Sequence, residues 1–223
     1  MTSSPENQFG QIEAERLRGD EEFRFGAECL PFSVHDFWAW SVSDLVSNAT
    51  RGRLAEYIVA KACGVDTSQP RDEWAPVDLE TPEGHLVEVK SAAYVQSWHQ
   101  KRLSQISFGV SKTRKWDPHT NEFATEKTRS ADVYVFALLA HRNQATIDPL
   151  NLDQWEFYVL PTCVLDSRKR SQHSITLPSF QGLNAGPYGF NELREQVHLA
   201  AHQNRRTRQD MGVGPPSRTE TSG

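Results

Sequence analysis

Long apolar runs, paired cysteines and a leader-like N-terminus are all lacking in this sequence. The longest apolar run covers residues 133–140, far short of a membrane span of about 20 residues. The three cysteines, Cys29, Cys63 and Cys163, are an odd number with no CxxC pair, which argues against a disulfide framework and a cysteine zinc site. The first thirty residues hold no continuous apolar segment. We therefore expect a soluble, cytoplasmic protein with no membrane partner.

Nucleotide-binding and metalloprotease motifs are absent as well. No GxxxxGK[ST] or GxGxxG loop occurs, so neither a nucleoside triphosphate nor a dinucleotide is implied. Two histidines, His198 and His202, stand four residues apart in an expected helix, but the sequence shows no HExxH motif and no third ligand beside them. We interpret this pair as part of a solvated helix face.

The composition is that of an ordinary globular protein, with 37% hydrophobic and 24% charged residues. A chain of 223 residues buries enough surface to fold without a metal or disulfide staple. We expect one folded domain over residues 44–203, preceded by an arm and aromatic capping segment over 1–43 and followed by a disordered tail over 204–223. Four aromatic residues of the capping segment are expected to pack onto the domain: Phe32, Phe37, Trp38 and Trp40.

Hydrophobic periodicity predicts an α/β domain. Apolar residues at helical spacing predict a helix over 44–63, with Gly64 as a stop signal and Gly52 as a candidate break. The pattern then changes to that of two strands, 74–80 and 85–91, joined as a hairpin by a turn at 81–84. The other expected elements are strands over 105–110, 131–140, 155–160 and 174–177 and helices over 161–168 and 191–203. Together they predict a mixed central sheet flanked by helices.

The residues that carry chemistry lie on the expected hairpin. Asp78 ends its first strand, and the second strand presents Glu88 and Lys90 on one face, since side chains alternate along a strand. The hairpin turn brings Asp78 opposite or diagonal to Glu88. Glu56, on the preceding helix, is a candidate third carboxylate. Carboxylates this close repel each other unless a cation lies between them, and Mg²⁺ prefers such hard oxygen ligands together with phosphate oxygens.

These residues resemble the PD-(D/E)XK nuclease superfamily, which has the restriction-endonuclease-like fold. The resemblance covers about residues 44–165 and rests on Pro76-Val77-Asp78, Glu88-Val89-Lys90 and the helical Glu56. It departs from the motif because Val77 separates Pro76 from Asp78. The resemblance implies that Glu56, Asp78 and Glu88 hold Mg²⁺, or Mn²⁺ as an alternative ion. It further implies that Lys90 assists the attacking water, as in a metal-dependent endonuclease that hydrolyses DNA phosphodiester bonds in restriction, mobile-element defence or repair.

Charge is distributed unevenly along the chain, although its sum is −5. Residues 88–130 carry eight bases against four acids, and residues 168–208 carry seven bases against two acids. Basic residues interleaved with aromatic residues beside a metal site are typical of a nucleic-acid-binding surface. The bases expected to contact nucleic acid are Lys101, Arg102, Lys112, Arg114 and Lys115. In the expected tail, Arg205, Arg206 and Arg208 form either a further basic arm or a solvated segment.

Two alternatives stay open at this point. Asp78 could cap a turn while Glu88 and Lys90 form an exposed ion pair on an edge strand, a common pattern of little energetic value. The same fold could also serve as a nucleic-acid-binding module without turnover, a difference that fold alone does not decide. RNA is an alternative substrate to DNA, and the sequence leaves open whether the protein forms a homodimer.

Overall fold

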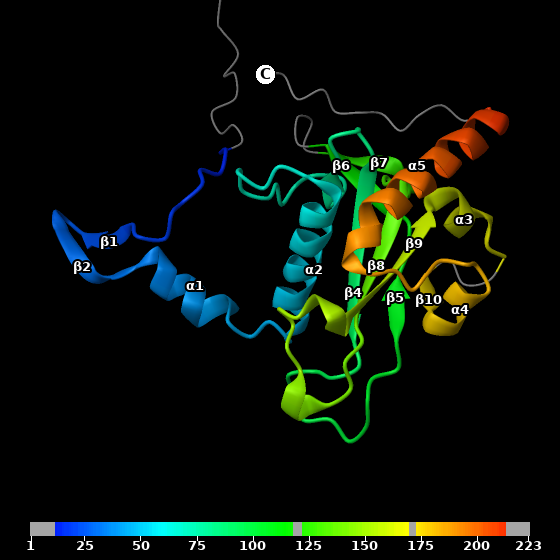
Figure 1. The fold of residues 1–223 in the computed structure, drawn as a ribbon. Coiled ribbons are helices and arrows are strands. Elements are labelled where there is room, and N and C mark those ends of the chain that lie inside the picture. The colour runs from blue at the N-terminus through cyan, green and yellow to red at the C-terminus, as the bar shows by residue number, and fades with distance from the viewer. Residues whose placement is uncertain (1–11, 118–121, 170–172, 213–223) are drawn as a thin grey trace, which may run out of the picture.

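A four-stranded mixed sheet forms the centre of the fold (Figure 1). The structure is a computed structural model that describes residues 12–117, 122–169 and 173–212. The strands of the sheet are, in spatial order, β3 (Leu79–Glu80), β4 (Leu86–Ala93), β8 (Val133–Leu139) and β9 (Trp155–Pro161). β4 runs parallel to β8, and the other two neighbouring pairs are antiparallel. The expected α/β class with a mixed central sheet is therefore confirmed.

Two helices, α2 (Asn48–Cys63) and α5 (Leu193–Asp210), cover one face of this sheet (Figure 1). The buried side of α2 repeats at helical spacing through Ala55, Val59 and Cys63, which pack with the buried valines of β4 and β8. The helix continues through Gly52 without a break and ends at Gly64, whose φ of 73° is the left-handed conformation of a helix C-cap. This packing fixes the position of α2 next to β4.

The opposite face of the sheet is covered by a smaller layer. It contains β5 (Ser107–Gly109), β10 (Ser174–Thr176), α3 (Thr162–Ser167) and α4 (Leu177–Gln181). Phe108 of β5 and Phe180 of α4 both pack against Phe136 of β8, with ring centroids 5.2 and 4.9 Å away. The expected strand at 105–110 does form, but it pairs with β10 in a separate two-stranded sheet. β8 is buried on both faces, as its continuous apolar run predicts.

The aromatic capping segment does not pack onto the domain, which corrects the expectation for it. The segment forms a hairpin of β1 (Glu22–Phe25) and β2 (Glu28–Ser33) followed by α1 (Val34–Val42), and these elements stand away from the central sheet (Figure 1). α1 contains no buried residue. Trp40 is 84% exposed and Phe37 is 49% exposed. The four aromatic residues within the nine positions 32–40 therefore make no core contact.

Helix α5 extends beyond its expected end at residue 203 and reaches Asp210. Asn204 is buried within it and donates a hydrogen bond to Asp132, 3.2 Å away. Residues 204–210 therefore belong to the folded domain, which corrects the expected tail boundary. The three arginines expected in a disordered arm are helical, and the rest of the expected tail beyond residue 212 lies outside the described residues.

A further hairpin, not expected from the sequence, consists of β6 (Thr113–Asp117) and β7 (Glu122–Thr128). Every residue of β7 is exposed. In the part of the chain that the structure describes, no helix has the length and apolarity needed to cross a membrane.

Candidate active site

The hairpin places Asp78 at the open edge of β4. The β3 strand is only two residues long, because residues 74–78 are irregular where a longer strand was expected. The pairing of β3 with β4 begins at Leu79, which lies opposite Val87. Two residues further along β4, where β3 offers no partner, the backbone N–H of Val89 donates to Asp78 Oδ2 at 2.8 Å. A buried amide needs an acceptor, so this hydrogen bond fixes the Asp78 carboxylate beside Glu88 and Lys90.

Side chains alternate along β4 as the sequence predicts. Val87 and Val89 are buried, with exposures of 0% and 5%. Glu88 and Lys90 lie on the other face and form an ion pair with each other. Their side chains are only 22% and 34% exposed, so the pair is more enclosed than a solvated pair on an edge strand. This exposure disfavours the interpretation of Glu88 and Lys90 as a simple surface pair.

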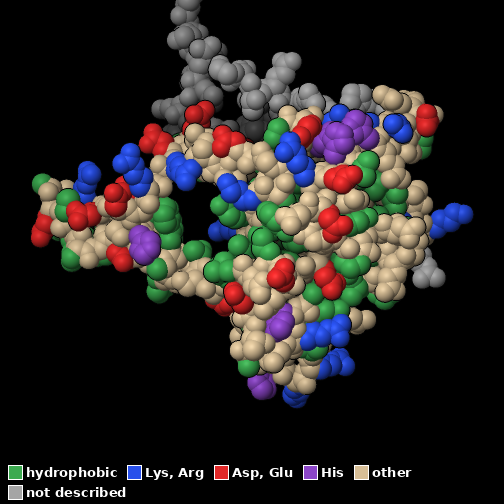
Figure 2. Space-filling model, in the orientation of Figure 1, with side chains coloured by type: hydrophobic (Ala, Val, Ile, Leu, Met, Phe, Trp, Pro, Cys, Tyr) green, Lys and Arg blue, Asp and Glu red, His purple; other side chains and the backbone are tan. Residues whose placement is uncertain are grey.

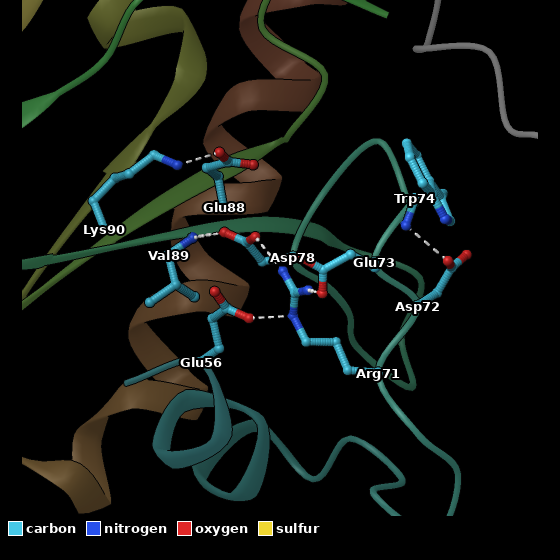
Figure 3. Close-up of polar contacts among 9 residues, drawn as sticks. All are labelled: Glu56, Arg71, Asp72, Glu73, Trp74, Asp78, Glu88, Val89 and Lys90. Carbon is cyan, nitrogen blue, oxygen red and sulfur yellow. Dashed lines mark hydrogen bonds and ion pairs between the residues drawn. The ribbon is translucent and has the colours of Figure 1, made fainter. Parts of the chain in front are cut away.

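Helix α2 brings Glu56 to the same edge of the sheet, where its side chain is 15% exposed. Figure 3 shows Arg71, from the loop after α2, extending its guanidinium between Glu56 and Asp78. Arg71 Nε lies 2.5 Å from Glu56 Oε2, and its Nη2 lies 3.5 Å from Asp78 Oδ1. A third contact joins Arg71 Nη1 to Glu73 Oε2 at 2.6 Å. One cationic group is therefore shared by one carboxylate of α2 and two carboxylates of the connection between α2 and β3.

The carboxylates affect one another electrostatically. Burial raises the pKa of Glu56, and the charge of Asp78 raises it further, while Arg71 and Lys90 act in the opposite direction. Burial also raises the pKa of Glu88, again with a contribution from Asp78, and Lys90 opposes the rise. These shifts have the sign expected when acidic groups are brought together in partial burial. The site therefore holds more negative charge than its two basic groups neutralise.

The donor set fits a divalent cation. Glu56, Asp78 and Glu88 offer carboxylate oxygens, the ligands that Mg²⁺ and Mn²⁺ prefer. The guanidinium of Arg71 shows that two of these carboxylates already converge on a single positive charge. The site can thus attract a cation and, through that cation and Lys90, a phosphate group.

Sequence reasoning missed Arg71, because the irregular loop that carries it has no periodicity to show where its side chain points. It also left the role of Ser91 open. Ser91 Oγ accepts a hydrogen bond at 3.1 Å from Nε of Arg51, a buried residue of α2. Arg51 also donates to Gln96 Oε1 at 3.2 Å. Ser91 therefore helps to hold α2, and with it Glu56, against β4.

The expected nucleic-acid residues fall into two groups on different elements. Lys101 and Arg102 lie in the loop after β4 and border a surface hollow of about 620 Å³. Lys112 and Arg114 lie at β6, where both are exposed, and Lys112 Nζ is 3.5 Å from Asp166 Oδ1. Lys115 is also in β6, but its side chain is outside the described part of the structure. The basic segment of the sequence therefore presents two basic surfaces.

The model of the family described as Bacteriophage T4 endonuclease IV matches residues 39–178, which is more than half of the chain. The matched part includes Glu56, Arg71, Asp78, Glu88 and Lys90. A search of the curated proteins found no match.

Proposed function

The chain belongs to the bacteriophage T4 endonuclease IV family, and from this premise we propose that it is a divalent-metal-dependent endonuclease that hydrolyses phosphodiester bonds of DNA. The observation that carries the proposal is that Glu56 and Asp78 share the guanidinium of Arg71 close to Glu88, whose carboxylate pairs with Lys90. A binding module has no need of such a costly concentration of partly buried charge. An endonuclease does, because phosphodiester hydrolysis builds negative charge around phosphorus.

Glu56, Asp78 and Glu88 would hold the ion, which we propose to be Mg²⁺, with Mn²⁺ as an alternative. A divalent ion bound there supplies a Lewis acid for the phosphate oxygens and lowers the pKa of a coordinated water. Asp78 is already fixed for this role, since the Val89 N–H orients its carboxylate at 2.8 Å. Glu88 is fixed by its position on β4, and Glu56 by the packing of α2 on the sheet.

Lys90 is proposed to act on the reacting group itself. Its ammonium lies on the same face of β4 as Glu88 and contacts the Glu88 carboxylate. From this position Nζ can donate hydrogen bonds to the attacking water and to the phosphate oxygen on which charge accumulates. Such a contact is stronger in the transition state than in the bound substrate, so it contributes to turnover more than to affinity.

Arg71 is proposed to compete with the metal ion. Its guanidinium neutralises Glu56 and Asp78, which are two of the three proposed ligands. Since the side chain is 36% exposed and comes from an irregular loop, it can move away at modest cost. Arg71 thereby keeps the acidic site compatible with folding when no divalent ion is bound.

For the fold, we propose the restriction-endonuclease-like arrangement of the PD-(D/E)XK superfamily. Two features support this assignment. An acidic helix residue, Glu56, precedes a hairpin that carries Asp78, Glu88 and Lys90, and the hairpin strand β4 has a parallel neighbour, β8. Restriction, mobile-element defence and repair are the roles for which such an enzyme is suited.

The basic surfaces at Lys101 and Arg102 and at Lys112 and Arg114 are proposed to contact the DNA backbone. Both pairs are exposed, and exposed Lys and Arg side chains supply most of the sequence-independent affinity for nucleic acid. Lys115 in β6 is included in this proposal. Such contacts make binding fall steeply with salt, which provides a measure independent of cleavage.

The decisive experiment is a cleavage assay with the full chain on single-stranded DNA, double-stranded DNA and RNA. Mg²⁺ and Mn²⁺ are titrated separately, and EDTA serves as the metal-free control. Cleavage that requires the ion and is lost in Asp78→Asn would support the proposal. Salt-sensitive DNA binding without any cleavage in either ion would instead establish the non-catalytic binding module, and preferred cleavage of RNA would correct the substrate.

A further inference from the structure

Three histidines from distant parts of the sequence meet at one place in the fold. His85 follows the β3–β4 turn directly, while His198 and His202 are one turn apart on α5. One ring nitrogen from each side chain lies within 4.8 Å of those of the other two. Figure 2 shows histidine side chains gathered in a patch beside α5. His85 is therefore the third histidine beside the pair on α5, which the sequence did not show.

The spacing of the rings suits a shared metal ion. His85 Nε2 and His198 Nδ1 are 3.2 Å apart. Two nitrogens bound to one tetrahedral Zn²⁺ at about 2.0–2.1 Å are separated by about 3.4 Å. The ring centroids of His198 and His202 are 4.3 Å apart, and that of His202 lies 5.7 Å from that of His85. All three imidazoles can therefore turn their nitrogens toward one point with little backbone movement.

His85 is the buried member of the cluster. The residue is 2% exposed, and its Nε2 faces His198 Nδ1 at 3.2 Å. Nε2 is therefore the ring nitrogen that can bind a shared ion, whereas Nδ1, the other ring nitrogen, has no hydrogen-bond partner among the described residues. Burial lowers the pKa of His85, and the charge of Arg205 and the two other histidines lower it further. This direction favours the neutral ring, which is the form that binds metals.

The two elements that carry the histidines are already held together. Arg194 of α5 forms an ion pair with Glu83 in the turn at 2.7 Å, and Arg205 of α5 donates to the carbonyl oxygen of Gly84 at 2.9 Å. Buried Leu193 and Val197 anchor α5 on the sheet. Because the backbone on both sides is fixed, a metal ion would find its ligands largely preorganised.

We propose that His85, His198 and His202 form a binding site for one divalent transition-metal ion, with Zn²⁺ as the ion that best fits three imidazole ligands. The site shares no residue with the carboxylate site of Glu56, Asp78 and Glu88. The two sites also differ in donor type, since imidazole selects Zn²⁺ and related ions while Mg²⁺ selects oxygen. A fourth coordination position is left for water or an exogenous ligand. Two of its ligands, His198 and His202, lie outside the residues 39–178 that match the endonuclease family, so the site goes beyond the proposed function.

The test is calorimetric titration of the full chain with ZnCl₂ in excess MgCl₂, which occupies the carboxylate site. We expect one Zn²⁺ per chain. His198→Ala and His202→Ala should each weaken binding by more than about 100-fold, since loss of a direct ligand exceeds the 10- to 100-fold effect of losing an outer-shell partner. Both residues are exposed, so these variants should fold. His99→Ala, at an exposed histidine outside the cluster, is the matched control and should bind as the parent does.

Two further readouts make the outcome decisive. Co²⁺ in place of Zn²⁺ should give the intense visible absorption of a four-coordinate ion, and this absorption should be absent from His198→Ala. Asp78→Asn should retain both signals, because its carboxylate belongs to the other site. The proposal is overturned if the folded parent binds no Zn²⁺, if the His198→Ala/His202→Ala double variant binds like the parent, or if Asp78→Asn abolishes the binding.

Discussion

The carboxylate site and the histidine cluster both take residues from the hairpin of β3 and β4, but they differ in their balance of charge. Asp78 enters the hairpin, His85 leaves its turn, and Glu88 follows three residues later. The carboxylate site accumulates negative charge, which Arg71 and Lys90 partly neutralise. The histidine cluster consists of imidazoles that are uncharged in their metal-binding form. One hairpin can thus contribute to two ligand sets of different chemistry, because its turn and its open edge face different neighbours.

This contrast has a consequence for the state without metal. An acidic site needs a substitute cation to be compatible with folding, and Arg71 provides one through Glu56 and Asp78. The three histidines carry no negative charge that would need one, and α5 is held to the turn by other contacts. The two sites should therefore respond independently to substitution and to ions, and the following predictions test this independence.

The largest effect is expected for Asp78→Asn. Loss of one ligand removes several kcal/mol of transition-state stabilisation, so cleavage in Mg²⁺ should fall by on the order of 10³-fold. Single-turnover rates on DNA give the measurement, and circular dichroism confirms that the variant folds. His202→Ala, at the other site, is the control and should cut at the parent's rate. Equal losses in the two variants would mean that the sites are not independent.

Lys90→Ala should follow with a smaller loss. Removing one donor to the developing charge typically costs about 10²- to 10³-fold in kcat, with little change in the affinity for DNA. Turnover and binding are measured on the same substrate, and Lys61→Ala on the exposed side of α2 serves as the control. A parallel loss of affinity and turnover would make Lys90 a phosphate anchor.

Arg71→Ala, unlike the two preceding variants, should strengthen the binding of the metal ion. Removal of the competing guanidinium should lower the Mg²⁺ concentration for half-maximal cleavage by roughly two- to tenfold, as expected for a partly exposed group. Arg53→Ala, an exposed arginine of α2, should leave that concentration unchanged. Zn²⁺ binding should be the same in both variants. If Arg71→Ala needs more Mg²⁺ than the parent, Arg71 supports the site and does not compete for it.

The smallest effects are expected in thermal stability, and their signs separate two glutamates of the hairpin. Because the pKa of Glu88 is raised from 4.5, its charge destabilises the metal-free fold at neutral pH. Glu88→Gln should therefore raise Tm slightly at pH 7.5 in EDTA, and the gain should vanish as the pH falls toward 4.5.

Glu83 should behave in the reverse way. Its hydrogen bond to Arg194 lowers the pKa of Glu83 to about 2, so the stability that it contributes is present above pH 4.5 and is lost as the pH falls from 4.5 to about 2. Glu83→Gln should lower Tm slightly at pH 7.5 and have no effect near pH 2. The same direction of change in both variants at pH 7.5 would contradict the assigned environments.

Much of the carboxylate site could be predicted from the sequence, because its residues lie on one short hairpin and one adjacent helix. Alternation along β4 determines that Glu88 and Lys90 share a face while Val87 and Val89 enter the core. The turn determines that Asp78 comes beside Glu88. The continuous apolar run of β8 determines that it is buried on both faces. These are local properties, since the period of an element decides which side chains point the same way.

Other features were decided only by tertiary structure. Arg71 reaches Glu56 from an irregular loop, and His85 meets His198 across a sequence separation of 113 residues. Trp40 is a second feature that the sequence could not predict. Its aromatic character favours burial, but the side chain is exposed, because no partner surface lies over it among the described residues. Periodicity fixes the direction of a side chain relative to its own helix or strand. Which distant side chain it meets depends on how whole elements pack, and here the packing of α5 over the sheet brings its histidines to the turn of the hairpin.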